Sequence, residues 1–204
     1  MTKQNVRGRI IKSLGGFYYV ADSEQKGNII ECRARGAFRQ QNVKPCVGDW
    51  AQVELTPQGK GYVVEIEERK NSLVRPPLAN LDQLVLVVSI ADPAPNAFVL
   101  DKLIAIAEYQ EIEPIIVITK CDLADPEEFA QIYRKAGFTV LETKSLQHEG
   151  IESVMEILKD KTSAFCGNSG AGKSTLLNAI DPRLSLDTGD ISQKLGRGRH
   201  TTRH

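Results

Sequence analysis

The phosphate-binding pattern G-x-x-x-x-G-K-S/T occupies residues 167–174 and is followed by Thr175, in the stretch Gly167-Asn168-Ser169-Gly170-Ala171-Gly172-Lys173-Ser174-Thr175. Glycines let the backbone approach phosphates, and successive N–H groups then point into one concavity at a helix N-terminus, where the helix dipole favours negative charge. Lys173 would reach the β- and γ-phosphates, and the Ser174 hydroxyl would bind Mg²⁺. An apolar stretch at 164–166 precedes the loop and a helical pattern at 175–180 follows it, as the motif requires. We therefore predict that these nine residues bind a nucleotide.

A second motif, Thr119-Lys120-Cys121-Asp122, follows the apolar run 114–118, which is typical of a buried parallel strand. Ligands bind at loops that follow the carboxyl ends of such strands. Asp122 can accept hydrogen bonds from the N1–H and 2-amino groups of guanine, a pair that adenine does not present, and the stem of Lys120 can pack along the base. Asn is usual at the first position, where this chain has Thr119. The motif predicts that all four residues bind GTP or GDP, and a Ser/Thr-rich turn at 143–145 is a weaker candidate for a third base contact.

The guanine motif precedes the phosphate loop, which reverses the usual order in GTPases, and a basic stretch, Gly196-Arg197-Gly198-Arg199-His200-Thr201-Thr202-Arg203, follows it. With a small β domain ahead of them, these motifs resemble the RsgA (YjeQ/YloQ) family of circularly permuted GTPases that assist maturation of the small ribosomal subunit. The resemblance covers essentially the whole chain, including Arg75-Pro76-Pro77 and Asn80-Leu81-Asp82-Gln83.

The resemblance implies GTP hydrolysis stimulated by the small (30S) subunit, an N-terminal OB-fold that touches 16S rRNA, and a C-terminal zinc-binding domain. This chain shows no ligands for Zn²⁺. His200 would be the catalytic residue in place of the usual water-positioning Gln, although a lone His in a basic loop is more often solvated or in contact with RNA. Either Thr201 or Thr202 would close on Mg²⁺ and the γ-phosphate, so that nucleotide state orders the loop 195–204.

Five short strand-like runs in the first third of the chain are separated by turn residues such as Gly15-Gly16, which indicates a small barrel; the runs are residues 8–12, 17–20, 28–32, 49–54 and 62–66. From Gln83 onward apolar strands alternate with helical patterns, which predicts a parallel sheet with helices on both faces. We therefore predict an all-β OB-fold barrel, residues 1–70, followed by an α/β P-loop GTPase domain, residues 71–204, that is circularly permuted and C-terminally incomplete.

The zero net charge conceals an uneven distribution. Residues 1–44 carry nine Lys/Arg against three Asp/Glu, residues 45–193 carry thirteen against twenty-three, and residues 194–204 carry four against none. Such asymmetry indicates an anionic partner, although a run of charge is often only a solvated face. We predict RNA contacts through Arg33, Arg35 and Arg39. Among the nearby aromatic residues, strand alternation predicts that Tyr18 is more exposed than Phe17 or Tyr19, and we expect Trp50 to lie in the core.

The remaining sequence features restrict where the protein acts. The four cysteines, Cys32, Cys46, Cys121 and Cys166, form no C-x-x-C pair and indicate reduced thiols. No apolar stretch approaches the length that spans a bilayer, and residues 1–5 do not open a signal peptide. These features favour a cytoplasmic protein with no membrane partner, which we expect to be a monomer.

A GTPase also needs an Asp-x-x-Gly segment, yet no Asp in this chain has Gly three residues later. We therefore read the chain as a fragment that binds GTP with negligible hydrolysis, and expect the strand before the phosphate loop to lie at an open sheet edge. Two alternatives remain open at this stage. One is an RNA-binding module that uses GTP only as a structural ligand, and the other is an ATP-dependent kinase or ATPase in which Asp122 is incidental.

Overall fold

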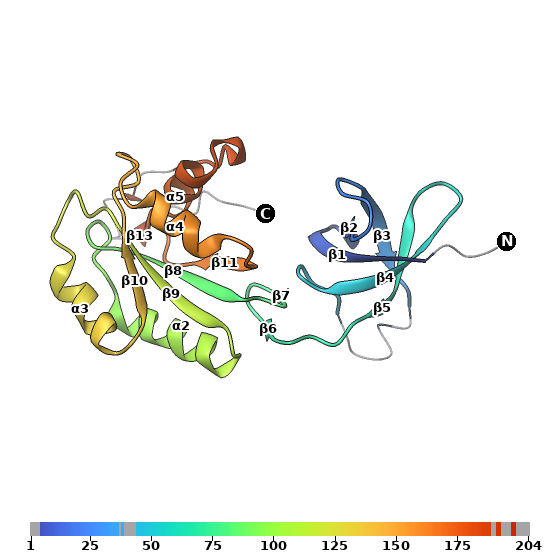
Figure 1. Ribbon diagram of the computed structural model, residues 1–204, viewed down its shortest axis with the longest axis horizontal. Helices are drawn as coiled ribbons and strands as arrows, with labels where there is room; N and C mark the ends of the chain where they lie inside the picture. The colour runs from blue at the N-terminus through green and yellow to red at the C-terminus, as the bar shows by residue number, and fades with distance from the viewer. Residues whose placement is uncertain (1–4, 37, 39–43, 189–190, 193–196, 199–204) are drawn as a thin grey trace. The chain divides into compact units, whose positions relative to one another are not determined.

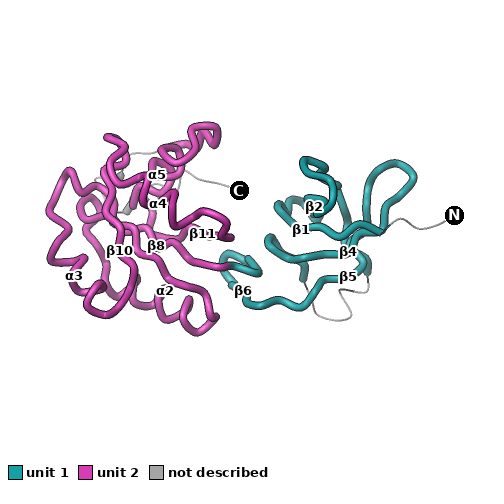
Figure 2. Tube along the Cα trace, in the orientation of Figure 1, with its two compact units in different colours: residues 1–81 teal, residues 82–204 magenta. Residues whose placement is uncertain are grey.

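The computed structural model describes residues 5–36, 38, 44–188, 191–192 and 197–198. Chain contacts divide the molecule into two compact units, residues 1–81 and residues 82–204 (Figure 2). Four of the predicted site residues lie outside the described residues: Arg39, His200, Thr201 and Thr202.

Unit 1 is built on a closed five-stranded barrel with the strand order β1-β2-β3-β5-β4 (Figure 1). The strands are β1 (Asn5–Leu14), β2 (Phe17–Asp22), β3 (Ile29–Ala34), β4 (Trp50–Leu55) and β5 (Gly61–Ile66). Gly15 and Gly16 connect β1 to β2 with positive φ angles of 58° and 83°, as a two-residue hairpin turn requires. The five strands predicted from the sequence are confirmed.

Two aromatic residues of the barrel lie elsewhere than the sequence led us to expect. Tyr18 is only 7% exposed and packs in the core with Val20, whereas Phe17 and Tyr19 are half-buried on the outer side. The prediction for Tyr18 was therefore wrong, because Tyr18 shares the inward face of β2 with the fully buried Val20. Trp50 is also not a core residue, since the neighbouring Ala51 fills the core and the Arg7 guanidinium lies 4.2 Å from the Trp50 ring centroid.

The chain after β5 packs back on the barrel through β7 (Leu78–Ala79), which pairs with β6 (Ser72–Leu73). Arg69 donates to both carboxylate oxygens of Asp49, at 2.7 and 2.8 Å, and the Asp49 side chain is fully buried. A Cβ atom at Gly48, where φ is 97°, would lie 2.0 Å from the Ala79 carbonyl oxygen, so the close approach of this segment requires glycine. These contacts belong to the compact unit that ends at Leu81.

Unit 2 contains a parallel sheet with the strand order β10-β9-β8-β11. The strands are β8 (Gln83–Ser89), β9 (Glu113–Thr119), β10 (Thr139–Glu142) and β11 (Ser163–Cys166), and the helices are α2 (Ala97–Tyr109), α3 (Glu127–Lys135), α4 (Ile151–Leu158) and α5 (Lys173–Ile180). A 3-10 turn (Pro182–Leu184) and the short pair β12 (Ile191–Ser192) and β13 (Arg197–Gly198) follow.

Helices cover both faces of this sheet, with α2 and α3 on one side and α4 and α5 on the other (Figure 1). Alternate residues of β8 point to opposite faces of the sheet. Val85 and Val87 lie on the face that packs with Ile151 of α4 and Leu176 of α5. Burial on both faces explains why β8 and β9 read as continuous apolar runs. Among the described strands β11 ends the sheet order, which confirms its predicted edge position. Among the residues that the structure describes, no helix has the length and apolarity needed to cross a membrane.

The Arg69–Asp49 pair gives a test of how the tail of unit 1 is held. Arg69→Ala leaves the Asp49 carboxylate buried without its cation, which should destabilise unit 1 by about 3–5 kcal/mol. Trp50 is the single tryptophan and lies in unit 1, so its fluorescence in urea titrations measures this change. Lys60→Ala removes an exposed ion pair with Glu31 and should barely move the midpoint. Equal midpoints for the two variants would contradict this account.

Candidate nucleotide-binding site

The phosphate-binding pattern forms a loop between β11 and α5. Its first glycine, Gly167, lies against the end of β8, where an added Cβ would be 2.1 Å from the Val87 carbonyl oxygen. Its last glycine, Gly172, has a φ of 84° and caps α5, whose first residue is Lys173. The sequence therefore folds as strand, loop and helix, with the N–H groups of the first turn of α5 directed toward the loop, as anion binding requires.

Lys173 lies along this loop. Its ammonium group donates to the carbonyl oxygens of Gly167 and Asn168, at 2.8 and 2.6 Å. Burial lowers the pKa of Lys173, because the charged form is poorly solvated there. Phosphate oxygens beside this ammonium would stabilise its charged form, so the loop is better suited to an anion than to a neutral ligand.

The guanine motif lies beside the phosphate loop. β9 ends at Thr119, which is 1% exposed, and the Thr119 hydroxyl donates to the Ala171 carbonyl oxygen at 2.7 Å. Residues 52 positions apart in the sequence are thus joined across the end of β8. Thr119, the departure from the usual Asn, supplies this link through its hydroxyl.

Lys120 and Asp122 follow in a tight turn closed by the Leu123 N–H, which donates to the Lys120 carbonyl oxygen at 2.9 Å. Lys120 has a φ of 60°, and its ammonium group donates to the Asp92 carbonyl oxygen. Burial lowers the pKa of Lys120, while the charges of Asp92 and Asp122 oppose that shift. The Asp122 carboxylate is exposed, so it is accessible to a base. Sequence reasoning missed Asp92, whose position just after β8 was the available signal.

The turn at 143–145 lies next to the guanine motif. The Thr143 N–H donates to the Ile118 carbonyl oxygen at 2.8 Å, and the Cys121 N–H donates to the Thr143 carbonyl oxygen at 3.3 Å. Lys144 forms an ion pair with Glu149 at 2.5 Å, and this pair raises the pKa of Lys144. The three candidate loops therefore follow β9, β10 and β11 at the same edge of the parallel sheet.

Ser174, the predicted Mg²⁺ ligand, lies in the first turn of α5, where its hydroxyl oxygen is the hard donor that Mg²⁺ prefers. Within the part of the chain that the structure describes, no group of three or more His, Cys, Asp or Glu side chains could hold a metal ion.

The arginines predicted to contact RNA differ in their surroundings. The Arg33 guanidinium lies 4.6 Å from the ring centroid of Phe17. Arg35 forms an ion pair with Glu54 at 2.7 Å, so part of its charge is compensated within the barrel. Their roles toward RNA stay predictions.

A parallel α/β sheet with a phosphate loop and a guanine motif at one edge defines a P-loop nucleotide-binding protein of permuted order. The RsgA GTPase profile matches residues 66–204, and the RsgA N-terminal domain profile matches residues 7–63. The chain belongs to the RsgA family of small ribosomal subunit biogenesis GTPases. These profiles meet near residue 65, and the domain boundary predicted between residues 70 and 71 stays a prediction.

Two curated relatives carry the description small ribosomal subunit biogenesis GTPase RsgA. The protein of Caldanaerobacter subterraneus subsp. tengcongensis is 48% identical over 203 residues, which are 98% of this chain and 68% of that protein. The Bacillus subtilis protein is 45% identical over 205 residues, which are 97% of this chain and 69% of that protein.

Two solved structures share the fold. YjeQ from Thermotoga maritima has a TM-score of 0.79 and 36% identity, with 90% of this chain and 68% of that chain covered. YloQ, described as a circularly permuted GTPase, has a TM-score of 0.74 and 40% identity, with 90% of this chain and 67% of that chain covered.

The hydroxyl of Thr119 can be tested directly. Thr119→Val keeps the shape of the side chain but loses the hydrogen bond to the Ala171 carbonyl oxygen. We expect GDP affinity to fall about tenfold, since a lost buried hydrogen bond costs roughly 1–3 kcal/mol. Isothermal titration of GDP measures the change. Thr119→Ser retains the hydroxyl and should stay within about threefold of the wild type; equal losses in the two variants would show that the hydroxyl is not the cause.

Proposed function

We propose that the chain binds GTP and GDP across the loops 119–122, 143–145 and 167–175, and that nucleotide state alters its affinity for the small ribosomal subunit. The observation that carries this proposal is the hydrogen bond from Thr119 to Ala171, because it holds the guanine-reading and phosphate-binding loops side by side. A nucleotide has its base at one end and its phosphates at the other, so one ligand can engage both loops.

Asp122 is the residue to which we assign base specificity. Its exposed carboxylate can accept from the N1–H and the 2-amino group of guanine, and the Lys120 stem, held by the Asp92 carbonyl oxygen, can lie along the ring. This pairing also distinguishes the proposal from the ATP-dependent alternative, in which Asp122 would have no partner on the base.

Lys173 and the loop N–H groups would hold the phosphates, with Ser174 and either Thr201 or Thr202 binding Mg²⁺. When bound, Mg²⁺ would neutralise developing charge on the phosphate oxygens. The carbonyl oxygens of Gly167 and Asn168 now accept from Lys173, and γ-phosphate oxygens would compete for the same ammonium donors.

We propose the small (30S) ribosomal subunit and its 16S rRNA as partners, with unit 1 as the RNA-binding part and Arg33, Arg35 and Arg39 among its contacts. The relatives named above are small ribosomal subunit biogenesis GTPases, and unit 1 is a barrel of the kind that binds nucleic acid. We further propose that the protein acts in the cytoplasm as a monomer.

Selectivity for guanine provides the first test of this function. The wild type should prefer GDP to ADP by about 10⁴–10⁵-fold, since a site built to pair polar groups rejects a ligand that lacks them. Asp122→Asn should weaken the binding of GDP and strengthen the binding of xanthosine diphosphate, as titrations of labelled nucleotides would show. The matched control is Asp125→Asn, which changes another exposed Asp three residues later and should bind GDP normally. Comparable wild-type affinities for GDP and ADP would reject the GTPase proposal.

His200 is the residue to which we assign positioning of the attacking water. The chain has no Asp-x-x-Gly segment, so by itself it should bind GTP with negligible hydrolysis. A full-length family member carrying this sequence should hydrolyse GTP about 10³–10⁵-fold faster once 30S subunits order the basic loop, and His200→Ala should lose that gain. Single-turnover hydrolysis with and without 30S subunits measures the stimulation of the unsubstituted protein and its loss in His200→Ala. If His200→Ala keeps the full stimulation while binding GTP normally, the catalytic assignment is wrong.

A further inference from the structure

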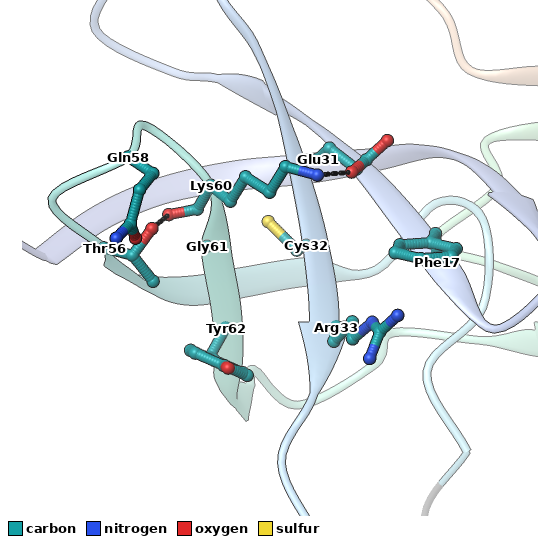
Figure 3. Close-up of a pocket in the computed structure, with 9 residues that line it drawn as sticks. All are labelled: Phe17, Glu31, Cys32, Arg33, Thr56, Gln58, Lys60, Gly61 and Tyr62. Carbon is teal, nitrogen blue, oxygen red and sulfur yellow. Dashed lines mark hydrogen bonds and ion pairs between the residues drawn. The ribbon is translucent and has the colours of Figure 1, made fainter.

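A hollow of about 240 Å³ opens on the outer side of the barrel, entirely within unit 1 (Figure 3). Strands β2, β3 and β5 form its floor, and the loop between β4 and β5 contributes Gln58 and Lys60 to its rim. OB-folds bind oligonucleotides over strands 2 and 3, flanked by the loops that join strands 1–2 and 4–5. The hollow therefore lies where this architecture places an extended ligand.

One row of side chains crosses the three strands of this floor. The pairing register sets Phe17 opposite Arg33 and Arg33 opposite Tyr62. The neighbours Tyr18, Cys32 and Val63 are buried in the core, so alternation directs the row outward. Tyr62 is 42% exposed, and the Arg33 guanidinium stacks 4.6 Å from the Phe17 ring centroid. The row thus reads aromatic, cation, aromatic.

A second row lies beside the first. The register sets Tyr19 opposite Glu31, and the Lys12 ammonium lies 5.5 Å from the Tyr19 ring centroid. Lys60 forms an ion pair with Glu31 at 2.8 Å, and this contact lowers the pKa of Glu31 (Figure 3). Glu31 is thus paired with Lys60, and Glu54, which lies opposite Tyr62 on β4, is paired with Arg35. The charges of Lys12 and Arg33 are left to favour an anionic ligand.

Resting on the proposed RNA binding by unit 1, we infer that this face binds a short unpaired stretch of RNA, with bases stacked on Tyr62 and on the Phe17–Arg33 pair. Unpaired bases stack on aromatic and guanidinium planes, and cations between them follow the backbone. A site that contacts only phosphates gains nothing from half-exposed rings in a hollow. Bases held in a duplex do not present their faces to such rings, so the site distinguishes unpaired from paired RNA.

The test uses the whole chain and a fluorescently labelled ten-nucleotide unpaired RNA, with a duplex of the same sequence for comparison. Tyr62→Ala should weaken binding of the unpaired RNA by about 5- to 150-fold, which corresponds to roughly 1–3 kcal/mol per stacked base, and should leave duplex binding unchanged. Tyr62→Phe keeps the ring and should retain the wild-type affinity. Tyr109→Ala, which removes an 84% exposed tyrosine from α2, is the matched control and should have no effect.

Salt dependence separates stacking from phosphate contact. Tyr62→Ala should keep the wild-type slope of log K against log [salt], whereas Arg33→Ala should reduce that slope by about one phosphate contact. Trp50 fluorescence in urea verifies that each variant with a substitution in unit 1 is folded.

The outcomes distinguish this inference from the proposed function on which it rests. If the wild type binds neither RNA, the proposed RNA-binding role of unit 1 fails. If the wild type binds RNA but Tyr62→Ala and Phe17→Leu bind unpaired RNA as well as it does, the base-stacking site is overturned while the proposed function stands. A polyglutamate peptide serves as an anionic ligand without bases. If Tyr62→Ala weakens binding of duplex RNA or of this peptide as much as it weakens binding of unpaired RNA, the base-stacking site is likewise overturned, since neither ligand offers free bases.

Discussion

The hydrogen bond from the Thr119 hydroxyl to the Ala171 carbonyl oxygen joins the two loops on which the nucleotide site depends. It is possible because every strand of a parallel sheet has its carboxyl end at the same edge, so the loops meet whatever their order along the chain. β8 lies between β9 and β11, and Gly167 packs directly on the Val87 carbonyl oxygen at its end. The spatial order of the strands therefore fixes the site, which explains how the reversed order of motifs can preserve it.

The sequence predicted most of unit 2 because its signals are local. β8 and β9 are buried on both faces and so read as unbroken apolar runs. The alternation of strands and helical patterns predicted from Gln83 onward appears as β8 to β11 with α2 to α5. The phosphate loop needs its glycines at particular positions, one against Val87 and one in the cap of α5, and such requirements leave a visible pattern.

The features that the sequence did not predict depend on which face of a strand points inward and on how neighbouring strands are paired. Phe17, Tyr18 and Tyr19 are consecutive aromatic residues, so no polar residue among them indicates which face is inward, and only the packing of Val20 decides it. The ion pair of Arg35 with Glu54 and the contact of Lys120 with Asp92 join residues far apart in sequence. Such pairs follow from how strands are aligned in space, which composition and spacing do not specify.

These pairings reduce the number of basic side chains in unit 1 that are available to an anionic partner. Residues 1–44 carry nine basic against three acidic side chains. The cations of unit 1, which also include Arg69 outside that range, serve at least three physical purposes. Arg69 neutralises a buried carboxylate, Arg35 is paired at the surface, and Arg33 lies against an aromatic ring. A buried pair is committed to the fold, whereas a guanidinium on an exposed ring keeps its charge and adds a flat surface. The count of charges therefore overstates the phosphate contacts that this unit can make, and the arrangement of arginines around aromatic side chains is the better guide to its partner.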